Sequence, residues 1–266
     1  MTLRAGPLII AHRGSSVVAP ENTLASFKQA IKDGADGLEF DVRLSRDGEP
    51  VVIHDSTLHR TANRPGIVSE LTAAELGQID VGSWFNEKHP QHARPGYPQE
   101  TLPSLAQVFE LTRGANQILY VEMKCETDQA RPLAAAVTQL IDEYSIAEQV
   151  VVESFDLSAI AEVKRLEPAI RTAALFEPQL GRPITWVRRS KTVTMTKQVE
   201  ADELALHHSL VTKRLVSMAR DAGLLLVTWT VDDPSWIEHA VKLDIKALIT
   251  NNPSILLAER ARSAAV

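Results

Sequence analysis

The sequence predicts one α/β domain over residues 1–266, a closed (β/α)8 TIM barrel with a small inserted cap after its second strand. Short apolar runs alternate with amphipathic stretches along the whole chain, which is typical of helices packed on a parallel sheet. The length of 266 residues fits one large barrel, and 44% hydrophobic with 23% charged residues is a globular composition. The same alternation also fits an open, doubly wound sheet, which is the alternative fold.

Eight apolar runs are predicted strands: Leu8–His12, Gly37–Leu44, Ile118–Met123, Val150–Ser154, Thr172–Phe176, Glu203–Leu206, Leu224–Thr230 and Ala247–Thr250. The clearest predicted helices are Thr23–Lys32, Leu105–Thr112, Ala130–Glu143 and Trp236–Leu243. In the first of these helices apolar residues recur at helical spacing, and Asn22 or Thr23 can cap its N-terminus.

A hairpin and a long irregular segment interrupt this alternation. The pair Asp47-Gly48 lies between two β-like runs, and such a pair is a strong hairpin signal. The extra strand Val51–His54 is therefore predicted to fold back and bring His54 near the end of the second strand. The segment at about 56–102 is rich in Pro, Gly and His and only weakly periodic. So long an irregular segment usually covers a functional site, and we interpret it as the inserted cap.

The charge and composition exclude several classes of partner. A net charge of -6 argues against nucleic acid or an anionic membrane as the main partner, but not against a small phosphate ligand. Neither a secretory signal nor an apolar run long enough to span a membrane is recognisable, so we expect no stable membrane insertion and a cytoplasmic location. The single cysteine, Cys125, cannot form an internal disulfide and is expected to be a small buried hydrophobe. The oligomeric state is not predicted.

Carboxylates occur on predicted strands that should be apolar. Glu39, Asp41 and Arg43 share one face of their strand, whereas barrel strands are usually apolar on both faces. Glu122 repeats the anomaly on the next strand, with Lys124 on the same face. Buried carboxylates need a cation or strong donors, and three of them suit Mg²⁺ or Ca²⁺ better than zinc. The structural alternative is that these residues only form buried ion pairs.

Two histidines are expected beside this acidic cluster. His12 ends the first strand, and His54 arrives on the hairpin; together they offer one general base and one general acid. The other six histidines are interpreted as mostly structural. Arg13 and Lys124 can hold a phosphate, or they can simply neutralise Glu39 or Asp41.

Two aromatic residues follow or end predicted strands at the barrel mouth. Phe155 and Trp229 can pack on the carbon skeleton of a substrate, or they can close the core.

These motifs, in this order, closely resemble the glycerophosphodiester phosphodiesterase family. The matching segments are Ala11-His12-Arg13-Gly14, Pro20-Glu21-Asn22-Thr23, Leu38-Glu39-Phe40-Asp41-Val42, His54-Asp55, Val121-Glu122-Met123-Lys124, Ser154-Phe155, Trp229-Thr230-Val231 and Leu248-Ile249-Thr250. Segments Ser69–Thr72 and Gly82–Phe85 resemble the insertion of that family.

The resemblance implies a distorted TIM barrel that hydrolyses a glycerophosphodiester to glycerol 3-phosphate and an alcohol. It also implies one divalent cation, held by the residues matching Glu39, Asp41 and Glu122. His12 and His54 would be the acid and base, with Arg13 and Lys124 on the phosphate.

The chain departs from the family pattern at a few positions. Asp232-Asp233 stands where Asn-Asp is more usual, and Ala247 and Asn251 stand where Gly and Asp are common. These positions are expected to lie outside the metal and proton-transfer set and to bear on substrate preference.

Three other functions remain open at this point. A lysophospholipase D or a cyclic-phosphate-forming phospholipase would need an apolar entry path, which Leu71, Trp84, Phe85 and Tyr97 can supply unless they form the core of the cap. The chain can also be a non-catalytic barrel that binds a phosphate ligand. In the third alternative the polar interior is purely structural.

Overall fold

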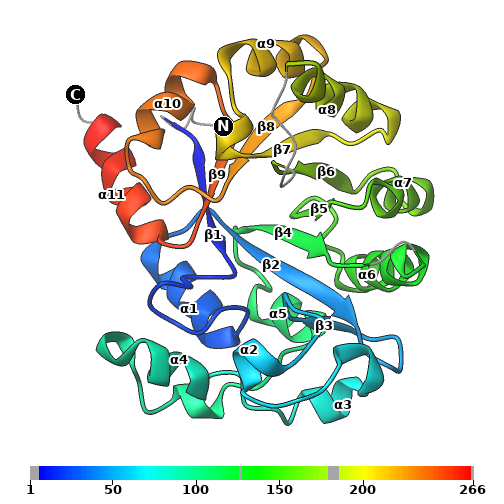
Figure 1. Cartoon of the computed structure of the whole chain (residues 1–266), viewed down its shortest axis with the longest axis vertical. Helices are drawn as coiled ribbons and strands as arrows, with labels where there is room; N and C mark the ends of the chain where they lie inside the picture. Colours follow the sequence, from blue (N-terminus) through cyan, green and yellow to red (C-terminus); the bar gives the residue numbers. More distant parts are fainter. Residues whose placement is uncertain (1–5, 126–127, 179–185, 265–266) are drawn as a thin grey trace.

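The computed structural model describes residues 6–125, 128–178 and 186–264, and it has the predicted fold: a parallel barrel ringed by helices (Figure 1). Its strands are β1 (Leu8–His12), β2 (Gly37–Leu44), β3 (Pro50–Val52), β4 (Ile118–Met123), β5 (Val150–Ser154), β6 (Arg171–Phe176), β7 (Glu203–His207), β8 (Leu225–Trp229) and β9 (Ala247–Thr250). The hydrogen-bonded order is β1-β9-β8-β7-β6-β5-β4-β2-β3. Parallel pairing of β1 with β2 closes the ring and rules out the open sheet.

The helices run between the strands on the outside of the barrel and through the insertion (Figure 1). They are α1 (Leu24–Asp33), α2 (His59–Ala62), α3 (Ala73–Leu76), α4 (Ser83–Lys88), α5 (Leu105–Leu111), α6 (Ala130–Tyr144), α7 (Leu157–Leu166), α8 (Trp186–Gln198), α9 (Lys213–Asp221), α10 (Trp236–Leu243) and α11 (Pro253–Ala264). Short 3-10 turns lie at η1 (Val68–Glu70), η2 (Pro90–His92), η3 (Tyr97–Gln99) and η4 (His208–Leu210). Of the two predicted caps for the first helix, Thr23 is the one used, in a capping box with Ser26.

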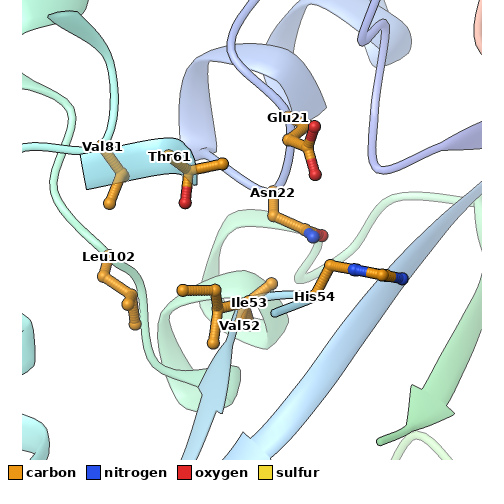
Figure 2. Close-up of a pocket in the computed structure, with 8 residues that line it drawn as sticks. All are labelled: Glu21, Asn22, Val52, Ile53, His54, Thr61, Val81 and Leu102. Carbon is orange, nitrogen blue, oxygen red and sulfur yellow. The ribbon is translucent and has the colours of Figure 1, made fainter. Parts of the chain in front are cut away.

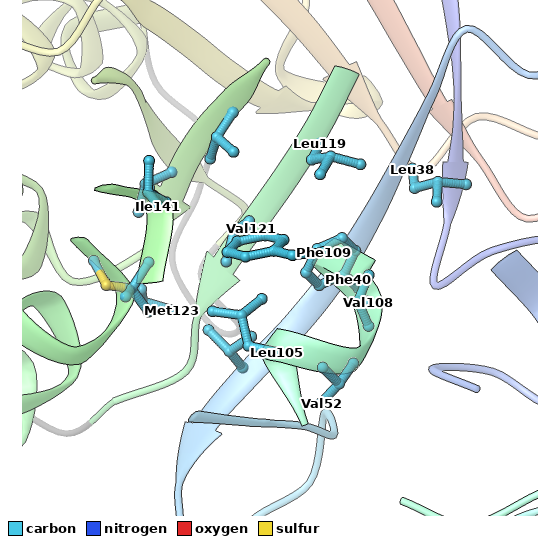
Figure 3. Close-up of a cluster of buried hydrophobic side chains, with 14 of the residues drawn as sticks. Leu38, Phe40, Val52, Leu105, Val108, Phe109, Leu119, Val121, Met123 and Ile141 are labelled. Carbon is cyan, nitrogen blue, oxygen red and sulfur yellow. The ribbon is translucent and has the colours of Figure 1, made fainter. Parts of the chain in front are cut away.

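Alternation along the strands separates two kinds of core. Leu38 and Phe40 of β2 and Val121 of β4 point outward and share one buried cluster with side chains of α1, α5 and α6, part of which is drawn in Figure 3. The inward-facing residues form a second apolar cluster in the barrel interior: Ile10, Tyr120, Val151, Ala173, Leu175, Ala205, Val227, Ala247 and Ile249. Toward the carboxyl ends of β2, β4 and β5, this apolar interior gives way to buried carboxylic acids. In a TIM barrel these strand ends form the face that carries the active site.

The predicted hairpin is present, with a shorter strand than expected. β3 pairs antiparallel to β2 and ends at Val52, whose N–H faces away from β2 and donates to the carbonyl of Pro103. The N–H of Ile53 donates to the carbonyl of Asp41, so His54 is still held beside β2.

The residues between β3 and α5 form the insertion, which contains α2, α3 and α4 and lies at the lower edge of the barrel in Figure 1. Trp84, Phe85 and Tyr97 are buried together against Ala19, and Leu71 packs on a second small cluster. The aromatic residues of the insertion are therefore its own core. In the described ranges, no helix is long and apolar enough to cross a membrane.

Candidate active site

Three carboxylates meet at the carboxyl ends of β2 and β4. Glu39, Asp41 and Glu122 each offer an oxygen atom, and these three atoms lie within 4.8 Å of one another. Asp41 and Glu122 are register partners in neighbouring strands, which brings them together. All three side chains are buried, and Oε1 of Glu39 has no hydrogen-bond partner among the described residues.

The pKa values show that this cluster carries more negative charge than its surroundings compensate. Burial, then the neighbouring carboxylates, raise the pKa of Glu39 well above its usual value and that of Glu122 to about 7. Burial also acts to raise the pKa of Asp41, but Arg13 and Lys124 outweigh it and hold that pKa below its usual range. Because hard oxygen ligands with excess negative charge are what Mg²⁺ and Ca²⁺ prefer, the residues present fit a divalent cation.

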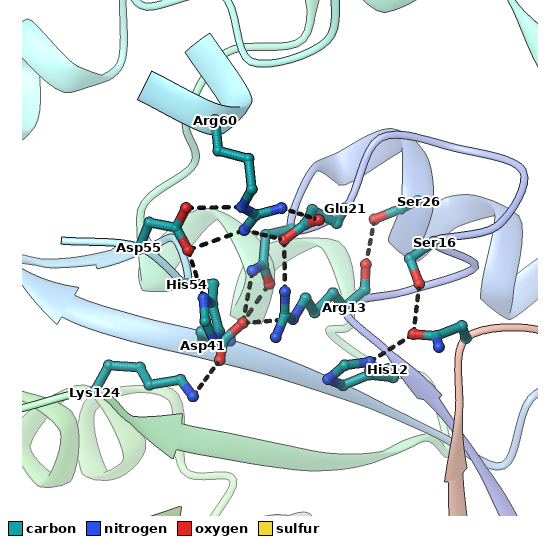
Figure 4. A network of polar contacts seen from close by, with 12 residues as sticks. His12, Arg13, Ser16, Glu21, Ser26, Asp41, His54, Asp55, Arg60 and Lys124 are labelled. Atoms are coloured by element: carbon teal, nitrogen blue, oxygen red, sulfur yellow. Dashed lines mark hydrogen bonds and ion pairs between the residues drawn. The ribbon is translucent and has the colours of Figure 1, made fainter. Parts of the chain in front are cut away.

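Asp41 is the centre of the surrounding polar network (Figure 4). It accepts from Asn22 Nδ2 at 2.8 Å and lies 3.1 Å from Arg13 Nε. Lys124 Nζ lies 3.3 Å from Asp41 Oδ1 and 2.7 Å from Glu122 Oε1. Arg13 and Lys124, the two side chains predicted to bind phosphate, therefore contact the acidic cluster as well. Neutralising the carboxylates is compatible with a second role toward a phosphate.

A strained turn after β1 aims the arginine at this cluster. Arg13 has φ of 55° and Asn22 has φ of 57°, a conformation that costs energy in residues other than glycine. Between them, Gly14 has φ of 81°, and a Cβ there would lie 2.4 Å from Ser26 Oγ. The N–H of Arg13 donates to Oε2 of Glu39 at 3.0 Å, which ties the turn to the carboxylates.

His12 lies beside the cluster with its ring mostly buried. Its Nε2 is 3.8 Å from Glu39 Oε2, and its Nδ1 is 2.7 Å from Oδ1 of Asn251. Burial, and then the charge of Arg13, lower the pKa of His12 to about 4. Asn251, which was expected to lie outside the metal and proton-transfer set, contacts His12 because closure of the barrel between β9 and β1 brings the two residues together.

His54 is oriented by a chain of ionic contacts (Figure 4). Its Nδ1 is 2.6 Å from Asp55 Oδ1. Arg60 then joins Asp55 to Glu21, because its Nε donates to Asp55 Oδ2 at 2.7 Å and its Nη1 donates to Glu21 Oε2 at 2.6 Å. Burial opposes ionisation of Asp55, but hydrogen bonds from Arg60 and His54 lower its pKa to about 2. Asp55 is therefore an acceptor, and Nδ1 of His54 carries the proton. Burial lowers the pKa of His54, against the opposing charge of Asp41.

A cavity of about 430 Å³ opens over these groups. It is lined by eight of the nine residues predicted for the site: His12, Arg13, Glu39, His54, Glu122, Lys124, Phe155 and Trp229. The ninth, Asp41, lies beneath them. Phe155 and Trp229 pack edge to face with ring centroids 5.4 Å apart, and together with Leu175 and Ile249 they give the cavity an apolar wall.

A second cavity behind His54 is too small for a substrate. Glu21, Asn22, Ile53 and Thr61 are among its lining residues (Figure 2), and its volume of about 10 Å³ is close to that of one water molecule.

Sequence reasoning missed one buried carboxylic acid that lines the cavity of about 430 Å³. Glu153 on β5 is buried next to Glu122 in the strand register, and burial raises its pKa well above the usual value. Its Oε2 has no hydrogen-bond partner in the described part of the chain. The same alternation that identified Glu122 places Glu153 in the barrel interior, so the signal was available.

Other residues near the site departed from expectation or had no sequence signal. Arg43 does not pair with the carboxylates but donates to the backbone carbonyls of His54 and Lys124. Cys125, expected to be a small buried hydrophobe, packs against the apolar core outside β4 but is only partly buried, and this burial raises the pKa of its thiol to about 11. Glu21 and Arg60 form an ion pair although they lie 39 positions apart in the sequence, and no local sequence pattern predicts such a contact.

Comparisons with known proteins agree with this geometry. Residues 12–255 match the model of the glycerophosphoryl diester phosphodiesterase family. The glycerophosphodiester phosphodiesterase of Caldanaerobacter subterraneus is 34% identical over 250 residues, which cover 94% of this chain and 96% of that protein. That of Bacillus subtilis is 31% identical over 253 residues, covering 93% of this chain and 84% of the relative. An Oleispira antarctica phosphodiesterase, solved with its product sn-glycerol-3-phosphate, superposes with a TM-score of 0.81 at 29% identity over 96% of both chains. The resemblance seen in the sequence is confirmed: this chain belongs to the glycerophosphoryl diester phosphodiesterase family and is a phosphoric diester hydrolase.

Proposed function

We propose that the chain hydrolyses small glycerophosphodiesters to glycerol 3-phosphate and an alcohol, with one divalent cation and with His12 and His54 as the acid/base pair. The observation that carries this proposal is the shared cavity: both histidines line it together with Glu39 and Glu122 of the acidic cluster. The relatives named for this activity and the product complex of the Oleispira enzyme support the choice of substrate.

Glu39, Asp41 and Glu122 would hold the cation, which is Mg²⁺ or Ca²⁺ because all three ligands are hard oxygens. When bound, such a cation polarises a phosphoryl oxygen and lowers the pKa of a nearby hydroxyl. Its positive charge would also offset negative charge that the cationic side chains of the site do not fully neutralise, as the raised pKa values of Glu39 and Glu122 indicate. This compensation would give a bound cation a role in stabilising the folded site as well as in the chemistry.

The side chains supply the remaining steps. Arg13 and Lys124 offset the negative charge of the diester beside the carboxylate cluster. One histidine removes the proton of the attacking hydroxyl, and the other protonates the oxygen of the departing alcohol. The attacking group is either the glycerol hydroxyl, giving a cyclic phosphate that water then opens, or water itself. His12 and His54 flank Arg13 in Figure 4, an arrangement suited to proton transfer on the two sides of one phosphate.

A water-soluble diester fits the cavity better than a lysolipid. The aromatic residues that would line an apolar entry path, Trp84, Phe85 and Tyr97, are buried in the insertion. The apolar wall near the chemistry consists of Phe155, Trp229 and a few neighbours, enough for a glycerol skeleton. The partner is therefore a small molecule, and the cytoplasmic location stays a prediction.

The histidine assignment is tested by alanine substitution. Turnover of glycerophosphocholine with added Mg²⁺ or Ca²⁺ should fall about 10²–10⁴-fold in His12→Ala and in His54→Ala. His239→Ala is the matched control, because His239 is exposed on α10 and does not line the cavity. Near-normal turnover in both site variants would remove the histidines from the mechanism, and loss of stability without loss of activity would favour a structural role.

A further inference from the structure

A series of side-chain hydrogen bonds leads from His12 to Asn251, in the loop after β9, and on to Asp232, in the loop after β8. His12 Nδ1 lies 2.7 Å from Oδ1 of Asn251, and Asn251 Nδ2 donates to Oδ2 of Asp232 at 2.7 Å. Oδ1 of Asp232 accepts from Thr250 Oγ1 at 2.9 Å and from the N–H of Asn251 at 2.8 Å. Asp232 and Asn251 are two of the positions at which the chain departs from its family pattern, and here they contact each other.

The donor and acceptor atoms available in this series fix the direction of each of its hydrogen bonds. A carboxylate only accepts hydrogen bonds, so the amide nitrogen of Asn251 must face Asp232. The amide oxygen of Asn251 then faces His12, where it also accepts from Ser16 Oγ at 3.3 Å. An amide oxygen cannot donate, and therefore Nδ1 of His12 must carry the proton.

We propose that Asn251 and Asp232 are positioning residues that hold neutral His12 as its Nδ1–H tautomer. In this tautomer the lone pair of Nε2 points to the side of the ring where Glu39 and the cavity lie. The ring is ready to exchange a proton at Nε2 without first rotating or changing tautomer. This role rests on the proposed function of His12, and neither positioning residue is required to touch the reacting atoms.

Exchanging the two side chains provides a sharp test. In Asp232→Asn, the new amide oxygen can still accept from Thr250 and from the N–H of Asn251, but its nitrogen then faces Asn251 Nδ2. Asn251 must turn over, present its nitrogen to His12, and force the Nε2–H tautomer. In Asn251→Asp, two carboxylates face each other. In the double variant Asn251→Asp/Asp232→Asn, every hydrogen bond of the wild-type series can be made again: only the bond between the side chains at 251 and 232 exchanges donor and acceptor, and Nδ1 of His12 still donates to an oxygen.

The experiment measures turnover of glycerophosphocholine with saturating Mg²⁺, and the ¹⁵N resonances of the His12 ring, in these variants. We expect kcat to fall about 10–100-fold in each single variant, with a smaller change in KM, and to recover most of that loss in the double variant. The ring spectrum should show a proton on Nδ1 in the wild type and on Nε2 in Asp232→Asn. Asp233→Asn is the matched control, because the neighbouring Asp233 is exposed and its carboxylate accepts from Ser235, through the backbone N–H and the side chain, rather than from the residues that lead to His12.

The outcomes separate this proposal from its alternatives. Unchanged kcat and an unchanged His12 tautomer in Asp232→Asn would overturn it. Losses that simply add in the double variant would indicate a structural link between two loops. If Asp232→Asn does not fold, Asn251→Ala removes the acceptor alone, and a ring that keeps one pure Nδ1–H tautomer in that variant contradicts the proposal. Absence of metal-dependent turnover in the wild type would instead contradict the proposed function, and the ring spectrum would still test the tautomer.

Discussion

Replacing Glu122 by glutamine should make the metal-free protein more stable at high pH while destroying its response to a cation. Burial and Asp41 raise the pKa of Glu122 from 4.5 to about 7. The unfolded chain therefore loses this proton at lower pH than the folded protein, and the free energy of unfolding falls as pH rises from about 4.5 to about 7. At pH 8 the ionised form costs about 3 kcal/mol, since each pKa unit corresponds to about 1.4 kcal/mol. Glutamine has no charge and avoids this cost.

The assay is urea unfolding, followed by tryptophan fluorescence in the presence of a chelator, at pH 5 and at pH 8. The free energy of unfolding of Glu122→Gln, measured relative to that of the wild type, should be larger at pH 8 than at pH 5 by about 2–3 kcal/mol. Glu49→Gln, at an exposed position of the hairpin turn, should show no such difference. Added Mg²⁺ or Ca²⁺ should stabilise the wild type and leave Glu122→Gln unchanged. A variant that follows the wild-type pH dependence would refute the reasoning.

Two further predictions follow from the same geometry. Because the raised pKa values keep Glu39 and Glu122 protonated near pH 6, cation binding should release both protons, and the affinity for the cation should rise by up to about a hundredfold between pH 6 and pH 7, a factor of about ten for each proton. Calorimetry in buffers of different ionisation enthalpy counts the protons, and none released would contradict the assignment. Gly14→Ala should lower the free energy of unfolding by more than about 2 kcal/mol, since its Cβ would lie 2.6 Å from the backbone carbon of Ser26. Gly34→Ala, with φ of 87° but no atom within 4 Å of its Cβ, should cost only about 1 kcal/mol; equal losses at the two positions would exclude the clash.

The parts of the fold that follow local periodicity were predictable. Strand alternation identified the barrel and also the polar face of β2, because a carboxylate every second residue in a buried strand is a strong local signal. The Asp47-Gly48 turn placed His54 correctly, since a hairpin fixes where the chain returns. Glu153 belongs to the same class of signal, although it is a single carboxylate on an otherwise apolar strand.

The parts that depend on closure of the barrel were not predictable from one sequence. Asn251 contacts His12 across 239 positions, and only the pairing of β9 with β1 brings these residues together. Arg60 joins Glu21 to Asp55 through two loops that have no regular pattern of their own. Such contacts depend on tertiary geometry, whereas hydrophobic periodicity reports only which face of an element is buried.

The most direct test of the central claim is release of glycerol 3-phosphate from glycerophosphocholine and glycerophosphoethanolamine. Each reaction is run with Mg²⁺, with Ca²⁺ and with a chelator, for the wild type and for Glu122→Gln. The account predicts release by the wild type that a chelator abolishes and added cation restores, and little release by Glu122→Gln under any of these conditions. Release that persists in chelator would contradict the role of the cation at Glu39, Asp41 and Glu122. Absence of release from both diesters with either cation would contradict the proposed substrate class.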